Sequence, residues 1–395
     1  MLTKEEERLI SLINEQDLLS FLQSLVRSNS ENPPGNEKET GNLIYNKLIA
    51  MGCPAEKHYV EGDRFNVIGT VEGSTKDKIL LNGHMDTVKI GNKEEWFFDP
   101  FCGDIQDGFL LGRGAADMKS GLAAMIFALE AVLKSGFELK KGIMFTGVID
   151  EEGYFKGTKA LIKDGKLKNC TLGFVSEPTG LKVGTSLKGG IEYLVQTSGK
   201  NAHSAMAFIG DNAIFKMNKV IGALEEYNKE LEKRMDLPVL RFPTVNVGKV
   251  HGGRGVTLVP DFCEMEFDRQ VLPGESIEDV EKEISQLMQD VERKYQIDVK
   301  CQKMQHFNPW AISHDHPLVK QVKDSYAKIF GGEPACSGVN YYAEVEMLAS
   351  NGIPSILFGP GDITLAHSPN EKVNIQEVID AAKVYALLLY HYAIA

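Results

Sequence analysis

The sequence predicts an α/β fold with a mostly parallel sheet, into which a ferredoxin-like α+β domain is inserted. Short apolar strands alternate with amphipathic helices over the first 187 residues, and the same alternation resumes after residue 303. Between them the order becomes strand, helix, strand, strand, helix, strand, which is the split βαβ pattern of a small domain. We therefore expect residues 1–187 and 304–395 to form one domain, interrupted by a second domain at residues 188–303.

In the first part of the larger domain, helices and strands are separated by glycine or by acidic residues. The apolar side chains of residues 119–135 recur at helical spacing, and Gly136 ends that helix. Short continuous apolar runs mark the strands that precede and follow it. In chain order we expect a helix at 36–51, a strand at 78–83, the helix at 119–135, and strands at 142–149 and 171–175.

The inserted domain has longer, alternating strands and charged helices. Its strands alternate apolar and polar side chains, as half-buried antiparallel strands do. We expect strands at 191–197, 244–250, 262–271 and 297–302, with helices at 211–235 and 276–295. After the insertion we expect a helix at 317–330, a strand at 353–358 and a helix at 375–392.

Composition excludes several classes of protein. The 395 residues are 43% hydrophobic and 25% charged, which is typical of globular domains large enough to bury full cores. A net charge of −12 without a basic block argues against nucleic acid or an anionic membrane as the main partner. The N-terminus lacks a signal pattern, no apolar run approaches the roughly 20 residues that span a bilayer, and the six cysteines form no CxxC pair. These features predict a cytoplasmic protein without a membrane partner.

Acidic residues and histidines come directly after the apolar strands. The carboxyl ends of parallel strands meet at one edge of a sheet, where ligands bind. Carboxylates gathered there repel one another unless a cation neutralises them, and imidazole with carboxylate ligands suits Zn²⁺ or a similar divalent ion. A glycine-rich turn before residue 119 could aim Asp117 at the same crevice. The residues that follow the strands are His84, Asp86, Glu151, Glu152, Glu177 and, after the last strand, His367.

Each of these pieces alone has a simpler interpretation. His84 with Asp86 could be a surface pair or a helix cap, and Glu151 with Glu152 could be a solvated pair of charges. The segment 112–117 resembles an incomplete GxGxxG motif, but its last position is Asp117, which would repel a pyrophosphate. In the sequence His314-Asp315-His316-Pro317, Pro317 suits a first helical turn, so we expect a helix cap rather than a metal site.

Five segments occur in order along the chain: Gly83–Val88, Gly112–Gly121, Asp150–Glu152, Ser176–Thr179 and Ala366–Glu371. Taken together, they resemble the co-catalytic zinc family of acetylornithine deacetylase, succinyl-diaminopimelate desuccinylase, aminoacylase and glutamate carboxypeptidase. The resemblance covers nearly the whole chain, including the insertion. It implies a metallohydrolase catalytic domain with an inserted lid and dimerisation domain.

The resemblance implies two divalent metal ions per chain, with Zn²⁺ expected and Co²⁺ or Mn²⁺ as alternatives. Glu151 would be the general base and Asp86 would orient a ligand histidine. The spacing alone does not distinguish the base from the ligand in the pair Glu151 and Glu152, so that assignment rests on the resemblance. The implied ligands are His84 and Glu177 at one ion, Glu152 and His367 at the other, and Asp117 as the bridge between them.

In the inserted domain, residues 199–205 resemble the family's lid histidine motif. The resemblance implies a homodimer in which His203 stabilises the oxyanion in the neighbouring subunit's site. Arg269 resembles an arginine that grips the substrate carboxylate, and a salt bridge on a strand face is the alternative for it. Ala207 departs from the lid motif, in which a proline is usual at this position. Three further departures concern the substrate pocket: Thr257 stands where many members have asparagine, Glu344 where an aspartate is common, and Gly153-Tyr154 follows Glu152 where Ile/Val-Gly-Gly is usual.

The predicted function is hydrolysis of an amide bond in a small carboxylate-bearing substrate. Within the family, a glutamate at position 177 accompanies deacylases, desuccinylases and carboxypeptidases, which favours an N-acyl amino acid as the substrate. A short peptide, cleaved by a dipeptidase or carboxypeptidase, is the nearer alternative. A non-catalytic carboxylate- or metal-binding module is the alternative of a different class, and the presence of Glu151 argues against it.

Overall fold

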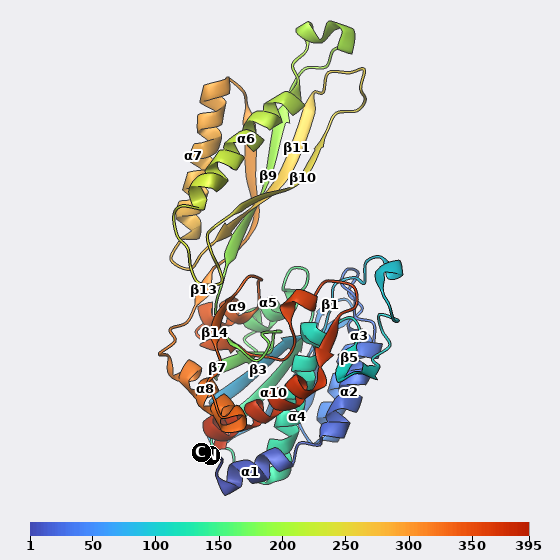
Figure 1. The fold of residues 1–395 in the computed structure, drawn as a ribbon, viewed down its shortest axis with the longest axis vertical. Helices are drawn as coiled ribbons and strands as arrows, with labels where there is room; N and C mark the ends of the chain where they lie inside the picture. The colour runs from blue at the N-terminus through green and yellow to red at the C-terminus, as the bar shows by residue number, and fades with distance from the viewer. Residues whose placement is uncertain (395) are drawn as a thin grey trace. The chain divides into compact units, whose positions relative to one another are not determined.

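The computed structural model describes residues 1–394, which form two compact units (Figure 1). The first unit comprises residues 1–185, 312–337 and 343–395, and the second comprises residues 186–311 and 338–342. We placed the second boundary after residue 303, but the second unit continues to Ala311, partly because β12 (Val299–Phe307) extends beyond the strand expected at 297–302. None of the helices within residues 1–394 is both long enough and apolar enough to cross a membrane.

Four parallel strands form the centre of the first unit's sheet. They lie side by side in the order β6 (Gly142–Val148), β3 (Lys78–His84), β7 (Cys170–Val175) and β15 (Ser355–Leu357). Antiparallel strands flank this centre: β1 (Ala55–Glu61) and β2 (Arg64–Val71) beside β6, and β8 (Val183–Leu187) beside β15. The mostly parallel sheet predicted from the sequence is confirmed.

Helices pack against this sheet. The helix α4 (Ser120–Ser135) is buried along nearly its whole length and packs against α10 (Ile375–Leu389), because most residues of both helices are apolar. The helix α8 (Pro317–Phe330) begins as predicted: His316 Nδ1 accepts the Leu318 N–H at 3.2 Å, and Pro317 occupies the first turn. The remaining helices are α1 (Lys4–Ser11), α2 (Glu15–Arg27), α3 (Lys38–Ala50), α5 (Lys156–Lys163) and α9 (Val345–Ser350).

A small separate sheet lies in the first unit and joins segments that are distant in the sequence. Its order is β16 (Lys372–Asn374), β5 (Phe109–Leu111) and β4 (Ile105–Gln106), all antiparallel. The strand β5 precedes the turn that carries Asp117, and β16 follows the loop that carries His367. Two further short strands, β13 (Trp310–Ala311) and β14 (Cys336–Val339), both pair with β8.

The second unit has the predicted β-α-β-β-α-β order. An antiparallel sheet in the order β10-β11-β9-β12 carries two helices, and its core consists of alternate strand residues and the apolar stripe of each helix. The elements are β9 (Gly189–Ser198), α6 (Ala213–Leu231), β10 (Val245–Gly252), β11 (Phe262–Val271), α7 (Ile277–Tyr295) and β12.

Candidate metal centre

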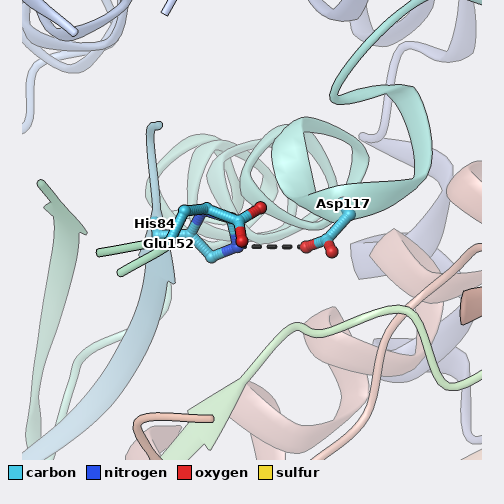
Figure 2. A group of neighbouring side chains, drawn as sticks. All are labelled: His84, Asp117 and Glu152. Atoms are coloured by element: carbon cyan, nitrogen blue, oxygen red, sulfur yellow. Dashed lines mark hydrogen bonds and ion pairs between the residues drawn. The ribbon is translucent and has the colours of Figure 1, made fainter. Parts of the chain in front are cut away.

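The predicted ligands of the first unit come from the ends of neighbouring strands. His84 is the last residue of β3, Glu152 lies in the turn after β6, and Glu177 follows β7. Because these strands are adjacent and parallel, their carboxyl ends bring the three side chains to one edge of the sheet. Asp117 reaches this edge from the short segment Ala115–Lys119 in front of α4, and Figure 2 shows its carboxylate turned toward His84 and Glu152.

Asp117 lies between two histidines. Its Oδ1 atom is 3.0 Å from His84 Nε2, and its Oδ2 atom is 3.4 Å from His367 Nε2. Each histidine also faces a glutamate: His84 Nε2 is 3.9 Å from Glu177 Oε1, and His367 Nε2 is 3.0 Å from Glu152 Oε2. The five side chains therefore form two groups that share Asp117. Single ligand atoms of His84, Asp117 and Glu152 lie within 4.8 Å of one another.

The ionisable side chains of this cluster shift one another's pKa. Burial, reinforced by neighbouring carboxylates, raises the pKa of Glu151, Glu152 and Glu177 above the ordinary value. Burial also acts to raise the pKa of Asp117, but hydrogen bonds with His367 and His84 outweigh it and hold that pKa well below its usual range. Hydrogen bonds with Asp117 and Glu152 raise the pKa of His367 to about 10.

The residues present fit divalent cations. Glu177 Oε1 is buried and accepts no hydrogen bond from any residue in the range 1–394, which leaves a carboxylate oxygen unsatisfied at the centre. The donor set of imidazole nitrogens and carboxylate oxygens, without thiolate, is the set that Zn²⁺ and similar ions accept. A cation there would offset the repulsion among the buried carboxylates.

Asp86 connects this cluster to the backbone beneath it. The His84 Nδ1 atom is 2.9 Å from the main-chain oxygen of Asp86 and 3.6 Å from its carboxylate, so Nε2 is left to face Asp117. The Asp86 carboxylate accepts the main-chain N–H of Glu151 and that of Glu152, each at 3.1 Å. One buried side chain thereby positions the turn that carries both glutamates.

Asn32 is a residue of the centre that the sequence analysis missed. Its side-chain Nδ2 donates to Asp86 Oδ2 at 2.9 Å and to Asp150 Oδ1 at 3.0 Å, and the Asn32 side chain is buried. Arg64 Nη2 donates to the same Asp150 oxygen at 3.1 Å. The sequence Asn32-Pro33-Pro34 is typical of a turn, and nothing in its spacing points to strands β3 and β6.

Glu344, noted as a departure from the family pattern, is also buried in the first unit. Its Oε2 atom accepts from Asn82 Nδ2 at 2.6 Å, and its other oxygen accepts from the Thr158 hydroxyl. Burial raises its pKa to about 6. Asn82 lies on β3, two residues before His84, so Glu344 supports the strand that presents this ligand.

The two predicted site residues of the second unit differ in exposure. His203 is exposed, and its Nδ1 accepts the Ala205 N–H at 3.1 Å. Arg269 is fully buried: its Nη2 donates to Glu275 Oε1 at 2.6 Å, its Nε donates to the Tyr227 hydroxyl at 3.3 Å, and its Nη1 donates to the Gln270 main-chain oxygen. This is the salt-bridge alternative, so the arrangement does not support the substrate-gripping role that we predicted for Arg269.

Comparisons with known proteins agree with this architecture. The chain is 30% identical to the acetylornithine deacetylase of Pasteurella multocida over 86% of its length and 87% of the relative. It is 27% identical to N-formyl-4-amino-5-aminomethyl-2-methylpyrimidine deformylase of Halalkalibacterium halodurans, over 96% of its length and 95% of the relative. Its fold matches that of an M20 family metallo-carboxypeptidase from Sulfolobus solfataricus with a TM-score of 0.79, at 20% identity over 95% of this chain and 99% of the other.

The family assignment rests on a match that covers every predicted metal ligand. The sequence pattern described as Peptidase family M20/M25/M40 matches residues 80–391, from within β3 to just beyond the end of α10. That range includes both the strand ends that meet at the candidate centre and the whole second unit. The chain therefore belongs to peptidase family M20/M25/M40 and is a metal-dependent hydrolase of amide bonds.

Proposed function

We propose that this protein is a dinuclear metallohydrolase that removes an acyl group from a small N-acyl amino acid. The observation that carries the proposal is the position of Asp117, whose two carboxylate oxygens face different histidines, His84 and His367. A single ion would need only one of these groups. Two groups of ligands that share one carboxylate are the arrangement expected of a two-metal site.

In this proposal the two groups are the two ligand sets. Divalent cations held there supply Lewis acidity, which polarises an amide carbonyl and makes water a better nucleophile at neutral pH. Zn²⁺ is the ion that we propose, with Co²⁺ or Mn²⁺ as substitutes. His84 and Glu177 belong to one set, Glu152 and His367 to the other, and Asp117 to both.

Glu151 is the proposed general base. Its carboxylate accepts no hydrogen bond within residues 1–394, whereas the carboxylate of Glu152 is paired with His367. A raised pKa suits this role, because the carboxylate must take a proton from water and then deliver it to the leaving amine near neutral pH. Asp86 holds the main-chain N–H of Glu151 and so limits where the base can point.

His203 is the proposed donor to the oxyanion that forms on the substrate carbonyl. Because Nδ1 accepts the Ala205 N–H, the neutral ring carries its proton on Nε2, which is the donor form. No hydrogen bond to Nε2 is found within the part of the chain that the structure describes. We propose that this donor acts in the active site of a second subunit.

The substrate class follows from the relatives and from Glu177. The two relatives named above remove an acetyl or a formyl group from nitrogen, and the glutamate at position 177 is the type that accompanies deacylases. A dipeptidase or carboxypeptidase activity is the alternative within the family. A module that binds metal or carboxylates without catalysis is the alternative outside it.

The direct test is a substrate panel measured on one preparation. The protein is stripped of metal with a chelator, reloaded with Zn²⁺, Co²⁺ or Mn²⁺, and assayed on N-acetyl, N-formyl and N-succinyl amino acids and on dipeptides. We expect metal-dependent release of the amino acid from an N-acyl substrate, with turnover lowered by about 10²–10⁴ in the Glu151→Gln variant. Turnover confined to peptides would overturn the deacylase assignment, and metal binding without turnover on the panel would favour the non-catalytic module.

A further inference from the structure

Glu371 and Arg113 lie in two of the sequence motifs but are neither proposed metal ligands nor the proposed base. Both residues are 1% exposed, and Arg113 Nη1 donates to Glu371 Oε2 at 2.6 Å. The other Glu371 oxygen, Oε1, accepts the main-chain N–H of Ala116 at 2.9 Å and that of Asp117 at 3.1 Å. Glu371 therefore contacts the backbone of the residue that lies between the two histidines.

Arg113 is itself held in place from several sides. Its Nη2 donates to the Lys89 main-chain oxygen at 3.3 Å, and its guanidinium lies over the Trp96 ring, 5.2 Å from the centroid. Its own main-chain N–H donates to the Pro100 oxygen at 2.7 Å. The guanidinium therefore presents a positive charge to Glu371 and orients its buried carboxylate.

Because of its position in the chain, Glu371 also links the segment that carries Asp117 to the segment that carries His367. Glu371 lies four residues after His367 and directly before β16, which pairs with β5 in front of the Asp117 turn. Its main-chain oxygen also accepts the Gly112 N–H at 2.9 Å. The segment that carries His367 is thus tied to the segment that carries Asp117 both by a strand pair and by one carboxylate.

We propose that Glu371, held by Arg113, is a positioning residue that sets the separation between Asp117 and His367 and so determines the affinity of the ion between them. The inference rests on the two-metal centre of the proposed function. A carboxylate that accepts two adjacent N–H groups fixes both the location and the orientation of that short segment. Because a buried ion pair is by itself weak evidence for a role in stability, the inference rests on the contact between Glu371 Oε1 and the main-chain N–H of Asp117.

The test measures Co²⁺ binding to the metal-free protein by calorimetry and by the visible absorption of the bound ion. Glu371→Gln removes the charge while keeping the shape. We expect one of the two Co²⁺ ions to bind about 10–100-fold more weakly, the range for partners that orient ligands, with a changed absorption spectrum at that site. His367→Ala serves as the reference for loss of the same ion. Glu130→Gln is the matched control, because Glu130 is also a buried carboxylate paired with a cation, Lys47, but contacts neither ligand segment.

A double variant separates loss of metal affinity from loss of folding. Arg113→Met combined with Glu371→Leu removes both buried charges and keeps an apolar pair of similar volume, which is often tolerated. We expect the double variant to show the same loss of Co²⁺ affinity while it still unfolds cooperatively well above the assay temperature; its unfolding temperature falls somewhat, because the main-chain N–H groups of Ala116 and Asp117 lose their acceptor. A parental protein that binds no Co²⁺ would overturn the proposed function itself. A parent that binds two ions, with folded variants that bind both as tightly, would overturn only the positioning role, as would a lowered unfolding temperature with unchanged affinity.

Discussion

At the scale of single residues, two adjacent glutamates have different surroundings. The turn after β6 presents Glu151 and Glu152, and Asp86 holds the main-chain N–H of each. Only the Glu152 carboxylate pairs with a histidine, at 3.0 Å from His367 Nε2. This difference supports the assignment of Glu152 as a ligand and Glu151 as the base, which spacing in the sequence does not supply.

Replacing Glu151 with glutamine is expected to lower kcat by about 10²–10⁴, the usual contribution of a general acid–base group. The substitution keeps the size and shape of the side chain but removes its basic oxygen. Metal content and unfolding temperature should stay at the parental values, as measured by elemental analysis and thermal denaturation. Activity within a few-fold of the parent would show that Glu151 is not the base.

Glu344 gives a pH-dependent prediction for the metal-free protein. Burial raises its pKa from an ordinary 4.5 to about 6, so the folded state holds this proton over a range where the unfolded chain releases it. The resulting stability is present below pH 4.5 and is lost as the pH rises through about 6. We expect the free energy of unfolding of the parent, relative to Glu344→Gln, to fall by about 2 kcal/mol between pH 4 and pH 7.

Denaturant titration at several pH values measures this difference. The exposed Glu278 provides the control, because Glu278→Gln should give an unfolding free energy that follows the parent at every pH. A parent and a Glu344→Gln variant whose stabilities run parallel across this range would contradict the assignment of a buried, protonated Glu344.

At the scale of elements, the close approach of α4 to β7 depends on one glycine. A Cβ atom at Gly121, in the first turn of α4, would lie 2.3 Å from the main-chain oxygen of Ser176 and 2.6 Å from its hydroxyl oxygen. Ser176 directly precedes Glu177. The helix that begins beside Asp117 and the strand end that carries Glu177 therefore meet without room for a side chain.

Gly121→Ala should consequently displace the Ser176–Glu177 backbone. We expect the free energy of unfolding to fall by about 1–3 kcal/mol, the usual cost of overpacking, and metal content after dialysis to fall with it. Gly222→Ala is the matched control, since Gly222 lies in α6 with no atom within 4 Å of the new Cβ; it should gain about 1 kcal/mol through helix propensity. A Gly121→Ala variant as stable and as metal-loaded as the parent would refute the tight contact.

The sequence predicts those elements whose apolar pattern is strong and misses those whose pattern is mixed. The parallel strands β3, β6 and β7 are continuous apolar runs, and acidic or imidazole side chains directly after them mark the site. The strand β1 has no such run, since it is half exposed at the edge of the sheet, and so it was not predicted. Other features depend on contacts between segments that are far apart in the chain, and no local sequence pattern predicts such contacts. Examples are the pairing of β5 with β16 and the hydrogen bonds of Asn32.

Arg269 shows that a sequence motif does not predict where a side chain points. A motif identifies the residue type but not the face of the strand to which the side chain points. On β11, Arg269 faces the buried side with Glu275 and Tyr227, while Gln270 is directed to Asp268 and Tyr342. The register of β11 against β9, which decides this, depends on pairing across the whole second unit.

At the scale of the whole molecule, the second unit bears an exposed apolar surface near His203. Its members are large apolar side chains from the short helix Ser204–Ile209, the start of α6 and the loop between β10 and β11, which lie at the same end of this unit (Figure 1). Exposed apolar groups of this kind are typical of protein interfaces. They support the proposed dimer, and they are Met206, Phe208, Ile209, Ile214, Phe215, Val256 and Leu258.

Subunit mixing tests whether His203 acts in the partner's site. His203→Ala and Glu151→Gln proteins, each of low activity, are combined under conditions that exchange subunits. If the histidine acts across the dimer, each mixed dimer holds one intact site, and an equal mixture should recover about a quarter of the parental activity. An arrangement within one chain leaves a defect in every site, so continued inactivity after proven exchange, or a strictly monomeric protein, would contradict the proposal.

The number of metal ions bound per chain distinguishes a bridged two-metal centre from a single-ion site. Metal analysis of the parental protein, loaded with Zn²⁺ and dialysed, should give two ions per chain, because the ligands form two groups that share Asp117. Asp117→Ala should lose both ions, since it removes one ligand from each group at once. A parent that holds a single ion, or an Asp117→Ala variant that keeps one ion at full occupancy, would contradict the bridged two-metal centre.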